Sequence, residues 1–538
     1  MSPAFSTRRT AGPPGERAGR PGTAYFLALD AGTSGARCVI VDETGSLLAT
    51  AVRPWSYVAP ADDTPYGREF SPSLFWEALC EVSREALARS GLSASAVAAV
   101  STTGQRLGIV LLDGEGREMF ASPNLDARAL IQGLVFDEEH AGRVYKATGH
   151  LPSFLLAPAK LRWLQEEQPQ IFARAASLLT VPDWVLFRLT GMAVAQRTTA
   201  AEAGLVEIDS GLWAEELLRL WALPMDLLPP LVDAGTLVGA ITAEAAEQTG
   251  LLAGTPVYAG GPDTQCGLLG LGLSAAGEVG LILGWSGPIQ MLAPAPRLDE
   301  AARTWTGRHV VPGAFVVEAN LQEAGNALRW LAELLFQGDL EEAHRQAGEA
   351  EVSSAGGAIP LHGSPGPGGP GMNGILAFLG PGPARSGPPG LRLGGLLFPV
   401  PLAAGPPDAP RLFRAALESV AFAVRANLAL LEEIAGRGAA RIALGGGLAR
   451  SLTFPTILAD ILDRPLEVGT TPEASALGAA ICAAVGYGLY GWPEAAAAMA
   501  SPRQAFTPRP SEAAAYDDLY RSWLEMGQAL ERAAQEMR

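Results

Sequence analysis

Short apolar runs separated by glycine turns open the sequence. One apolar run covers residues 25–30, a second follows the turn at 31–35, and a third covers 47–52. This pattern predicts a β-hairpin and a third strand. A helix entered through Ser71 comes next, because apolar residues then recur at three- and four-residue spacing. These residues are Phe75, Leu79, Val82 and Ala86.

Apolar strands and amphipathic segments continue to alternate along the chain, which is typical of an α/β fold. Residues 277–293 repeat the opening pattern of strand, glycine turn and strand. Three pairs of small residues match between the two turns: Gly32 with Gly284, Ser34 with Ser286, and Gly35 with Gly287. A repeat at about half the chain length predicts a duplicated architecture of two lobes, with the ligand site in the cleft between them.

The repeat suggests a division of the chain into four parts. Residues 1–23 are rich in Pro, Gly and Arg and lack the apolar centre of a secretion signal, so we expect a disordered tail. An N-terminal domain is expected at 24–255, a C-terminal domain at 256–505 and an amphipathic helix within 506–538. The Pro- and Gly-rich stretch at 356–410 predicts long surface loops.

Charge and composition narrow the classes of partner. The formal net charge of −17 opposes association with nucleic acid or anionic membrane surfaces, so neither partner is expected. The uncharged stretch 474–492 is mostly Ala and Gly, and we expect a buried helix there rather than a membrane span. The four cysteines form no CxxC pair, which favours a cytoplasmic protein without disulfides or zinc. A homodimer is left open.

The histidines and lysines of the sequence do not point to a catalytic role. The five histidines show no ligand spacing, so each is expected at a surface or loop position. They are His140, His150, His309, His344 and His362. The chain has only two lysines, Lys146 and Lys160, and lysine chemistry is therefore not expected.

The first glycine turn is a candidate phosphate site. Residues 30–35 would expose successive backbone N–H groups and two hydroxyls, which suits phosphate oxygens, and Asp30 could hold magnesium through water. An ordinary hairpin turn accounts for the same residues, but the second copy at Gly284 favours the functional interpretation. The sequence contains no GxxxxGK[ST] motif, which excludes a P-loop nucleotide site.

Asp263 is the most informative carboxylate. It follows an apolar run and the Gly-Gly-Pro segment at 260–262, just before a predicted helix of small residues. In such a position the side chain could cap the helix. It could instead accept a hydroxyl proton during phosphoryl transfer.

Five motifs together resemble those of the FGGY carbohydrate kinases, over nearly the whole ordered chain. They are DAGTSGAR at Asp30, the GxxD ending at Asp263, LGWSG at Leu283, LGGGLARS at Leu444 and EASALGAA at Glu473. Within this family the chain is most similar to the autoinducer-2 kinases and next to the xylulokinases. The resemblance implies an α/β fold with two actin-like ATPase (ribonuclease H-like) lobes and an interdomain cleft.

The resemblance also implies a reaction, in which ATP with Mg²⁺ donates its γ-phosphate to a hydroxyl of a small linear sugar, polyol or autoinducer-2-like substrate. A pentulose kinase of the xylulokinase type is an alternative. A second alternative is a catalytically weak sugar- and ATP-binding sensor, because Trp285 and Leu107 stand where many relatives have threonine and a glutamate or histidine, respectively.

Site residues follow from the resemblance position by position. Asp263 is implied as the general base and Asp30 as the metal ligand. The implied ATP-binding residues are Thr33, Ser34, Arg37, Ser286, Gly287, Gly325, Gly446, Gly447 and Ser451. Asp263 is also implied in substrate binding, together with Gln105, Arg106, Asp126 and Gln265. Asp126 could equally form an internal salt bridge with Arg128.

Overall fold

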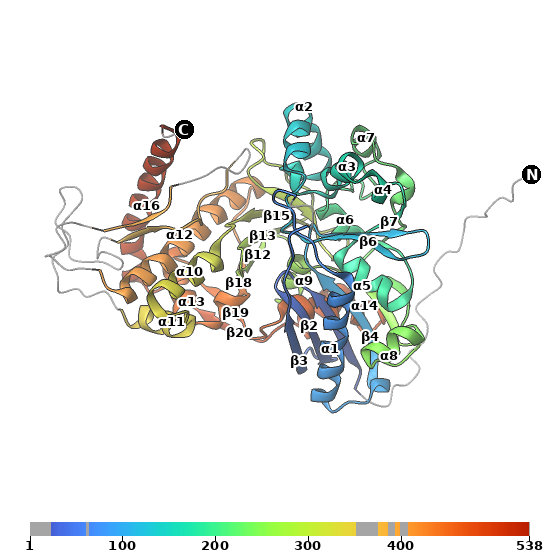
Figure 1. The fold of residues 1–538 in the computed structure, drawn as a ribbon. Helices are drawn as coiled ribbons and strands as arrows, with labels where there is room; N and C mark the ends of the chain where they lie inside the picture. Colours follow the sequence, from blue (N-terminus) through green and yellow to red (C-terminus); the bar gives the residue numbers. More distant parts are fainter. Residues whose placement is uncertain (1–22, 61–63, 351–374, 386–392, 399–406, 537–538) are drawn as a thin grey trace, which may run out of the picture.

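Two lobes lie side by side in the computed structural model, one built mainly from the first half of the chain and one from the second (Figure 1). The structure describes residues 23–60, 64–350, 375–385, 393–398 and 407–536. The predicted disordered tail, apart from residue 23, and most of the Pro- and Gly-rich stretch at 356–410 lie outside the described residues.

A six-stranded sheet forms the centre of the first lobe. Its strand order is β10 (Leu237–Ala240), β11 (Pro256–Pro262), β4 (Val97–Gly104), β1 (Tyr25–Ala31), β2 (Gly35–Asp42) and β3 (Leu47–Pro54). Strand β1 is antiparallel to β2 and parallel to β4, and the predicted hairpin with its third strand is confirmed. Because β11 pairs with β4, the first sheet is completed beyond residue 255, where the sequence suggested a boundary.

Alternation along β1 places its side chains on two faces. Leu27 and Leu29 pack in a cluster with the predicted helix, α1 (Pro72–Ser90). Phe26 and Ala28 pack in another cluster with α14 (Ala474–Gly486), which comes from the second half of the chain. Successive strand residues point to opposite faces, so a nearly continuous apolar run predicts a sheet covered on both sides.

The second lobe repeats this strand arrangement. Its strand order is β14 (Trp305–Arg308), β15 (Phe315–Asn320), β13 (Pro288–Ala293), β12 (Glu278–Ile282), β18 (Arg441–Gly445), β19 (Leu466–Gly469) and β20 (Arg503–Phe506). Strand β12 is antiparallel to β13 and parallel to β18, as β1 is to β2 and β4. The second glycine turn therefore joins β12 to β13 as the first joins β1 to β2.

Two helices of small residues pack against each other between the lobes. A Cβ atom on Gly270, at the end of α9 (Asp263–Gly270), would lie 2.0 Å from the Ala474 carbonyl oxygen of α14. One on Gly478 would lie 1.8 Å from the Cys266 carbonyl oxygen. The small residues of 474–492 thus permit close helix packing, although the helix ends at Gly486 rather than spanning the whole stretch. Across the described residues, no helix is long and apolar enough to cross a membrane.

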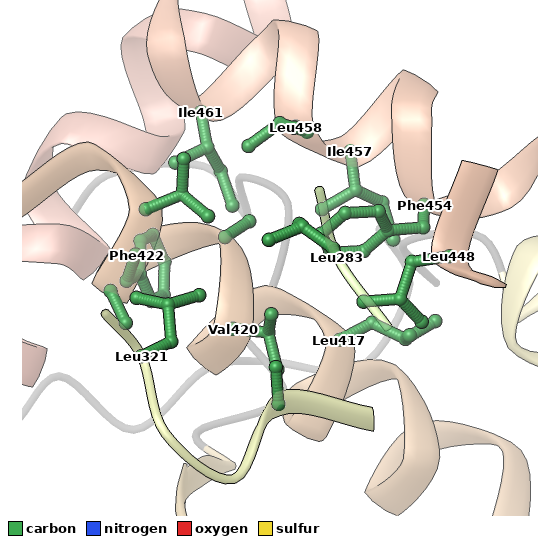
Figure 2. Packing of buried hydrophobic residues seen from close by; sticks show 14 of the residues in the cluster. Leu283, Leu321, Leu417, Val420, Phe422, Leu448, Phe454, Ile457, Leu458 and Ile461 are labelled. Atoms are coloured by element: carbon green, nitrogen blue, oxygen red, sulfur yellow. The ribbon is translucent and has the colours of Figure 1, made fainter. Parts of the chain in front are cut away.

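The core of the second lobe holds the start of the second turn in place. Leu283 follows β12 and is fully buried in one cluster with residues of α12 (Ala409–Ala435) and α13 (Thr453–Leu462). Figure 2 shows Leu283 beside Phe454 and Ile457 of α13, with Leu417 of α12 nearby. This packing fixes the position from which the turn leaves the sheet.

Further elements surround these two sheets. Those of the first half are β5 (Ile109–Asp113), β6 (Glu118–Ser122), β7 (Ala175–Thr180), β8 (Ala195–Gln196), β9 (Leu231–Val232), α2 (Leu130–Thr148), α3 (Ala157–Glu167), α4 (Pro169–Phe172), α5 (Val181–Thr190), α6 (Arg197–Glu202), α7 (Glu215–Leu220) and α8 (Ala243–Thr249). Those of the second half are α10 (Ala324–Phe336), α11 (Leu340–Glu349), β16 (Leu376–Phe378), β17 (Gly395–Leu397), α15 (Trp492–Ala498) and α16 (Pro510–Glu536). Helix α16 confirms the predicted C-terminal helix.

Candidate active site

A cavity of about 990 Å³ lies between the two lobes, and both halves of the chain line it. Four of the predicted site residues are on its wall: Thr33, Arg106, Asp263 and Ser286. Glu318 and Trp305, from neighbouring strands of the second sheet, line it as well. The expectation of a ligand cleft between the lobes therefore agrees with the structure.

Asp30 lies near the end of β1 and is only 3% exposed. Arg37 Nη1 donates to its Oδ2 at 3.4 Å, and Arg37 Nε lies 3.1 Å from Oε2 of Glu473, the residue that precedes α14. Arg37 therefore links carboxylates from the two halves of the chain. Burial raises the pKa of Asp30 to about 6, against the opposing effect of Arg37 and with an added contribution from Glu473. Among the described residues, Oδ1 of Asp30 has no hydrogen-bond partner.

Asp263 is the first residue of α9 and faces the cavity. Its Oδ1 accepts a 2.8 Å hydrogen bond from the amide of Thr264, the next residue. Pro262 occupies the N-cap position of α9, so Asp263 is not the capping residue. Burial raises the pKa of Asp263 to about 7, while Arg106 opposes the shift and Asp30 adds to it. A carboxylate with a pKa near neutrality is suited to accept a proton from a bound hydroxyl.

Arg106 joins carboxylates from both lobes beside Asp263. Its Nη1 donates to Glu202 Oε2 at 2.7 Å and to Glu318 Oε2 at 2.7 Å, and its Nη2 donates to Glu318 Oε1 at 2.9 Å. Gln265 donates to Glu202 at 2.7 Å, and Gln290 donates to Glu318 at 2.7 Å. The guanidinium is thus held in a fixed orientation while part of it still lines the cavity.

Glu202 and Glu318 were missed in the sequence. Glu318 interrupts an otherwise apolar strand, FVVEAN, and a lone carboxylate in a buried strand is a signal that could have drawn attention to it. Glu202 ends a helix of small residues, and nothing in its local sequence distinguishes it.

Gln105 connects two parts of the wall without lining the cavity. Its Oε1 accepts from the Asn124 amide at 2.8 Å, and its Nε2 donates to the Tyr57 hydroxyl at 3.1 Å. Tyr57 donates to the Thr33 carbonyl at 2.6 Å, and Asn124 Nδ2 donates to Thr33 Oγ1 at 2.8 Å. Asn124 itself lines the cavity, although it was not among the residues expected from the sequence.

Asp126 lies behind the wall in an internal ion pair. Arg128 Nε donates to both of its carboxylate oxygens at 2.9 Å, and the Arg68 amide donates to Oδ1 at 3.0 Å. The Arg128 guanidinium lies over the rings of Phe120 and Trp163, at 4.8 and 4.9 Å. Asp126 is fully buried and does not line the cavity, so the geometry favours the salt bridge over the predicted substrate contact.

The second turn is enclosed by two glycines that leave no room for a side chain. A Cβ atom on Gly325 would lie 2.1 Å from the Gly284 carbonyl oxygen, and one on Gly446 would lie 2.6 Å from the Leu283 carbonyl oxygen. Gly446 also has a φ of 88°, which favours glycine. Segments distant in the sequence therefore pack directly against the backbone of this turn.

Trp285 occupies the tip of the same turn and is 48% exposed. The backbone around it is closed by a 3.0 Å hydrogen bond from the Gly284 amide to the Ser286 carbonyl and a 3.3 Å bond from the Asn326 amide to the Trp285 carbonyl. The indole is half exposed, and Trp285 is not among the residues that line the cavity, whereas Ser286 is.

The remaining predicted nucleotide residues lie on turns and helix starts outside the cavity wall. Ser34 Oγ accepts from Arg37 Nη2 at 3.1 Å, and the Gly287 carbonyl accepts from the Leu321 amide at 3.0 Å. Gly447 is exposed and follows the β18 turn, and Ser451 Oγ accepts from the Thr453 amide at 3.1 Å before α13. Their contacts with a nucleotide stay predictions.

The histidines differ from expectation in their burial. His150 and His309 lie in connecting segments, as expected, but both are buried. His344 is buried on α11, so the expectation of a surface or loop position is wrong for this residue. Burial lowers the pKa of His309 to about 3 and that of His344 to about 4. His150 Nε2 lies 3.6 Å from Glu202, so this ring extends the polar group around Arg106. His362 lies outside the described residues.

Two lobes of similar topology enclose a cavity whose wall holds Asp263 and a residue of each glycine turn, which is the arrangement expected for a two-lobed phosphotransferase. Comparisons with known proteins agree. Residues 25–270 match the N-terminal domain of the FGGY family of carbohydrate kinases, and residues 282–487 match its C-terminal domain. The chain belongs to the FGGY family of carbohydrate kinases.

Individual relatives extend this result. The chain is 32% identical to the autoinducer-2 kinase of Yersinia pseudotuberculosis serotype O:3 over 484 residues, which cover 87% of each protein. It is 29% identical to the xylulose kinase of Rhodospirillum rubrum, whose crystal structure matches 94% of this chain and 99% of that one with a TM-score of 0.78. The gluconate kinase of Lactobacillus acidophilus shares the fold, with a TM-score of 0.81 at 19% identity over 96% of this chain and all of that one.

These findings confirm the predicted fold class and the predicted reaction class. The chain has two actin-like lobes and is an ATP-dependent carbohydrate kinase, a phosphotransferase with an alcohol group as acceptor. Its substrates are small molecules.

Proposed function

We propose that this kinase phosphorylates a hydroxyl of a small linear dihydroxy ketone of the autoinducer-2 type. The cavity wall is the observation that carries the proposal. Its polar part contains Asp263, Arg106 and Asn124, whereas a separate set of lining side chains is apolar: Leu107, Leu134, Leu151 and Leu155. The sequence identity of 32% with the autoinducer-2 kinase of Yersinia pseudotuberculosis gives independent support.

The apolar part of the wall discriminates among acceptors. A hydroxyl placed against leucine side chains loses its hydrogen bonds to water without replacement, which disfavours fully hydroxylated sugars. A carbon chain with one reduced end avoids this cost, because its methyl group can lie against Leu107 while its hydroxyls face Asp263. Leu107 therefore favours an acceptor with an apolar end over a polyol.

Asp263 acts as the general base in this proposal. It accepts the proton of the acceptor hydroxyl as the hydroxyl oxygen bonds to the γ-phosphorus, and the bond from that phosphorus to the ADP oxygen breaks. Arg106, fixed by Glu202 and Glu318, orients the acceptor and keeps a positive charge beside Asp263. The amides of the two glycine turns bind the phosphates.

Magnesium fits beside Asp30. The buried Oδ1 of Asp30, unpartnered among the described residues, suits a cation or one of its water ligands. The described part of the chain contains no cluster of three or more metal-ligating side chains. Magnesium would therefore be held chiefly by phosphate oxygens and water, and it would neutralise charge on the transferred phosphate.

ADP release measured with separate acceptors tests the proposal. We expect kcat/KM to be highest for dihydroxypentanedione, lower for D-xylulose and lowest for glycerol. A clear preference for D-xylulose would favour the second candidate, a pentulose kinase, which the likeness to xylulose kinase supports. No acceptor-dependent ADP release with any of them, while ATP still binds, would contradict both candidates and support a sensor.

A further inference from the structure

Lys160 is a buried cation directly behind the acceptor wall. It lies in the first turn of α3, and its side chain is among the largest that are fully buried. Both settings disfavour a positive charge, because burial removes water and the start of a helix carries positive partial charge. Burial lowers the pKa of Lys160 to about 8, even though Asp126 is close enough to oppose the shift. An apolar residue would fill this position at lower cost.

The ammonium group contacts two separate segments of the cavity wall. Its Nζ donates to the Leu107 carbonyl at 2.9 Å and to the Pro123 carbonyl at 3.1 Å. Each carbonyl belongs to, or directly precedes, a residue that lines the cavity: Leu107 itself and Asn124. Arg106 precedes Leu107 in the same turn. One cation thus joins the two turns that carry three residues of the cavity wall, namely Arg106, Leu107 and Asn124.

Leu107 needs such support because its backbone conformation is unusual. Its φ of 67° lies in the left-handed region, which a branched residue without special stabilisation seldom adopts. Orientation of the Leu107 carbonyl toward Lys160 accompanies this conformation, and the conformation determines where the isobutyl group meets the cavity. Gln105 adds a second link between the same turns through the Asn124 amide.

We propose that Lys160 is a positioning residue for the acceptor site, which fixes Leu107 and Asn124 through their backbone and thereby sets the shape of the wall. The proposal rests on the proposed function for the identity of the acceptor. It assigns no chemical step to the lysine, whose ammonium reaches carbonyl oxygens behind the wall.

The test compares Lys160→Met with Lys146→Met, which replaces the only other lysine, an exposed residue at the end of α2. Hydrogen exchange of the protein without ligands is measured first. We expect faster exchange in peptides covering 105–112 and 120–127 of Lys160→Met alone, and unchanged exchange in the glycine turn at 283–288. Lys160→Gln keeps one hydrogen-bond donor group, so its exchange rates at 105–112 and 120–127 should lie between those of wild type and Lys160→Met. This variant replaces Lys160→Met in the test if the methionine variant folds poorly.

Kinetics with dihydroxypentanedione and ATP supply the second measurement. Displacement of the wall should raise the acceptor KM about tenfold or more in Lys160→Met. The ATP KM should rise clearly less, because the wall reaches the first glycine turn only through the contact of Asn124 with Thr33. Equal changes in both KM values, or a lower melting temperature with unaltered exchange at 105–112 and 120–127, would overturn the proposal. If wild type turns over neither dihydroxypentanedione nor D-xylulose, the proposed function fails, and the exchange result alone decides the role of Lys160.

Discussion

The two glycine turns have the same place in their sheets but are stabilised differently. The first turn is fixed by side chains: Arg37 contacts Asp30 and Ser34, and Asn124 contacts Thr33. The second is fixed by backbone contacts, and its most prominent side chain, Trp285, extends into solvent. Both turns join a pair of antiparallel strands, but the ion pair of Asp30 with Arg37 belongs to the first turn. We infer that the first turn contributes charged side chains to the site. The second turn contributes backbone N–H donors.

Asp30→Asn should cause the largest loss among changes in the turns. It removes the carboxylate expected to hold magnesium, so we expect kcat to fall about a hundredfold and the Mg²⁺ concentration for half-maximal rate to rise. Steady-state ADP release over a Mg²⁺ series measures both effects. Ser286→Ala is the matched change in the second turn and should alter kcat less than about threefold, because the amide donors remain. Similar losses in the two variants would remove the contrast between the turns.

Gly325→Ala should damage the second turn through its backbone. The added Cβ would lie 2.1 Å from the Gly284 carbonyl oxygen, so the turn must shift, and we expect the ATP KM to rise about tenfold or more. Gly284→Ala provides the control, since its added Cβ would meet no described atom within 4 Å. Calorimetric titration with an ATP analogue compares the two. An unchanged affinity in Gly325→Ala would show that this turn does not bind phosphate through its backbone.

The pH dependence of kcat/KM between pH 8 and pH 6 should report on Asp263. With a pKa of about 7, Asp263 is increasingly protonated below pH 7 and then cannot accept a proton. We expect kcat/KM to level off above pH 7 and to fall about tenfold per pH unit between pH 7 and pH 6. Below pH 6 the fall should steepen, because Asp30, with a pKa of about 6, is protonated as well. A profile that stays flat from pH 8 to pH 6 would contradict this assignment. Ser286→Ala, which leaves Asp263 unchanged, should keep the same profile.

Trp285→Thr should have the smallest effect. The indole is half exposed and the turn backbone is closed without it, so the variant should bind ATP as well as wild type or up to about threefold more tightly through the added hydroxyl. Calorimetry with ATP and with the acceptor measures this. A clear loss of affinity for either ligand would show that Trp285 packs on that ligand.

Local patterns predicted the framework of both lobes because strands and helices have fixed side-chain periods. The hairpin at 25–42 and its second copy at 277–293 were found from alternation and glycine turns, and α1 was found from its apolar spacing. The candidate base Asp263 was found for the same reason, since it directly follows an apolar strand that ends in Gly-Gly-Pro. Such patterns lie within short segments of sequence, so they can be recognised without knowledge of the tertiary structure.

Contacts between distant segments could not be predicted. Glu318 meets Arg106 across 212 residues of sequence, and neither residue carries a local signal for the other. Burial of Lys160 was missed because a lysine in an amphipathic helix is normally solvated, and only the tertiary fold brings two carbonyls to its ammonium group. Asp126 shows the opposite case, because sequence alone could not choose between a substrate contact and the ion pair with Arg128.

The kinetics of Asp263→Asn test the central claim most directly. Asparagine keeps the size of the side chain and the hydrogen bond from Thr264 but cannot accept the proton, so kcat for dihydroxypentanedione should fall about a hundredfold to ten-thousandfold while ATP affinity is unchanged. Because the folded protein raises the pKa of Asp263 from its ordinary 3.8 to about 7, ionisation of Asp263 destabilises the fold as pH rises from about 4 to 7. The variant should therefore melt at or above the wild-type temperature at pH 8. Retention of more than about a tenth of the wild-type kcat by this folded variant would contradict the account.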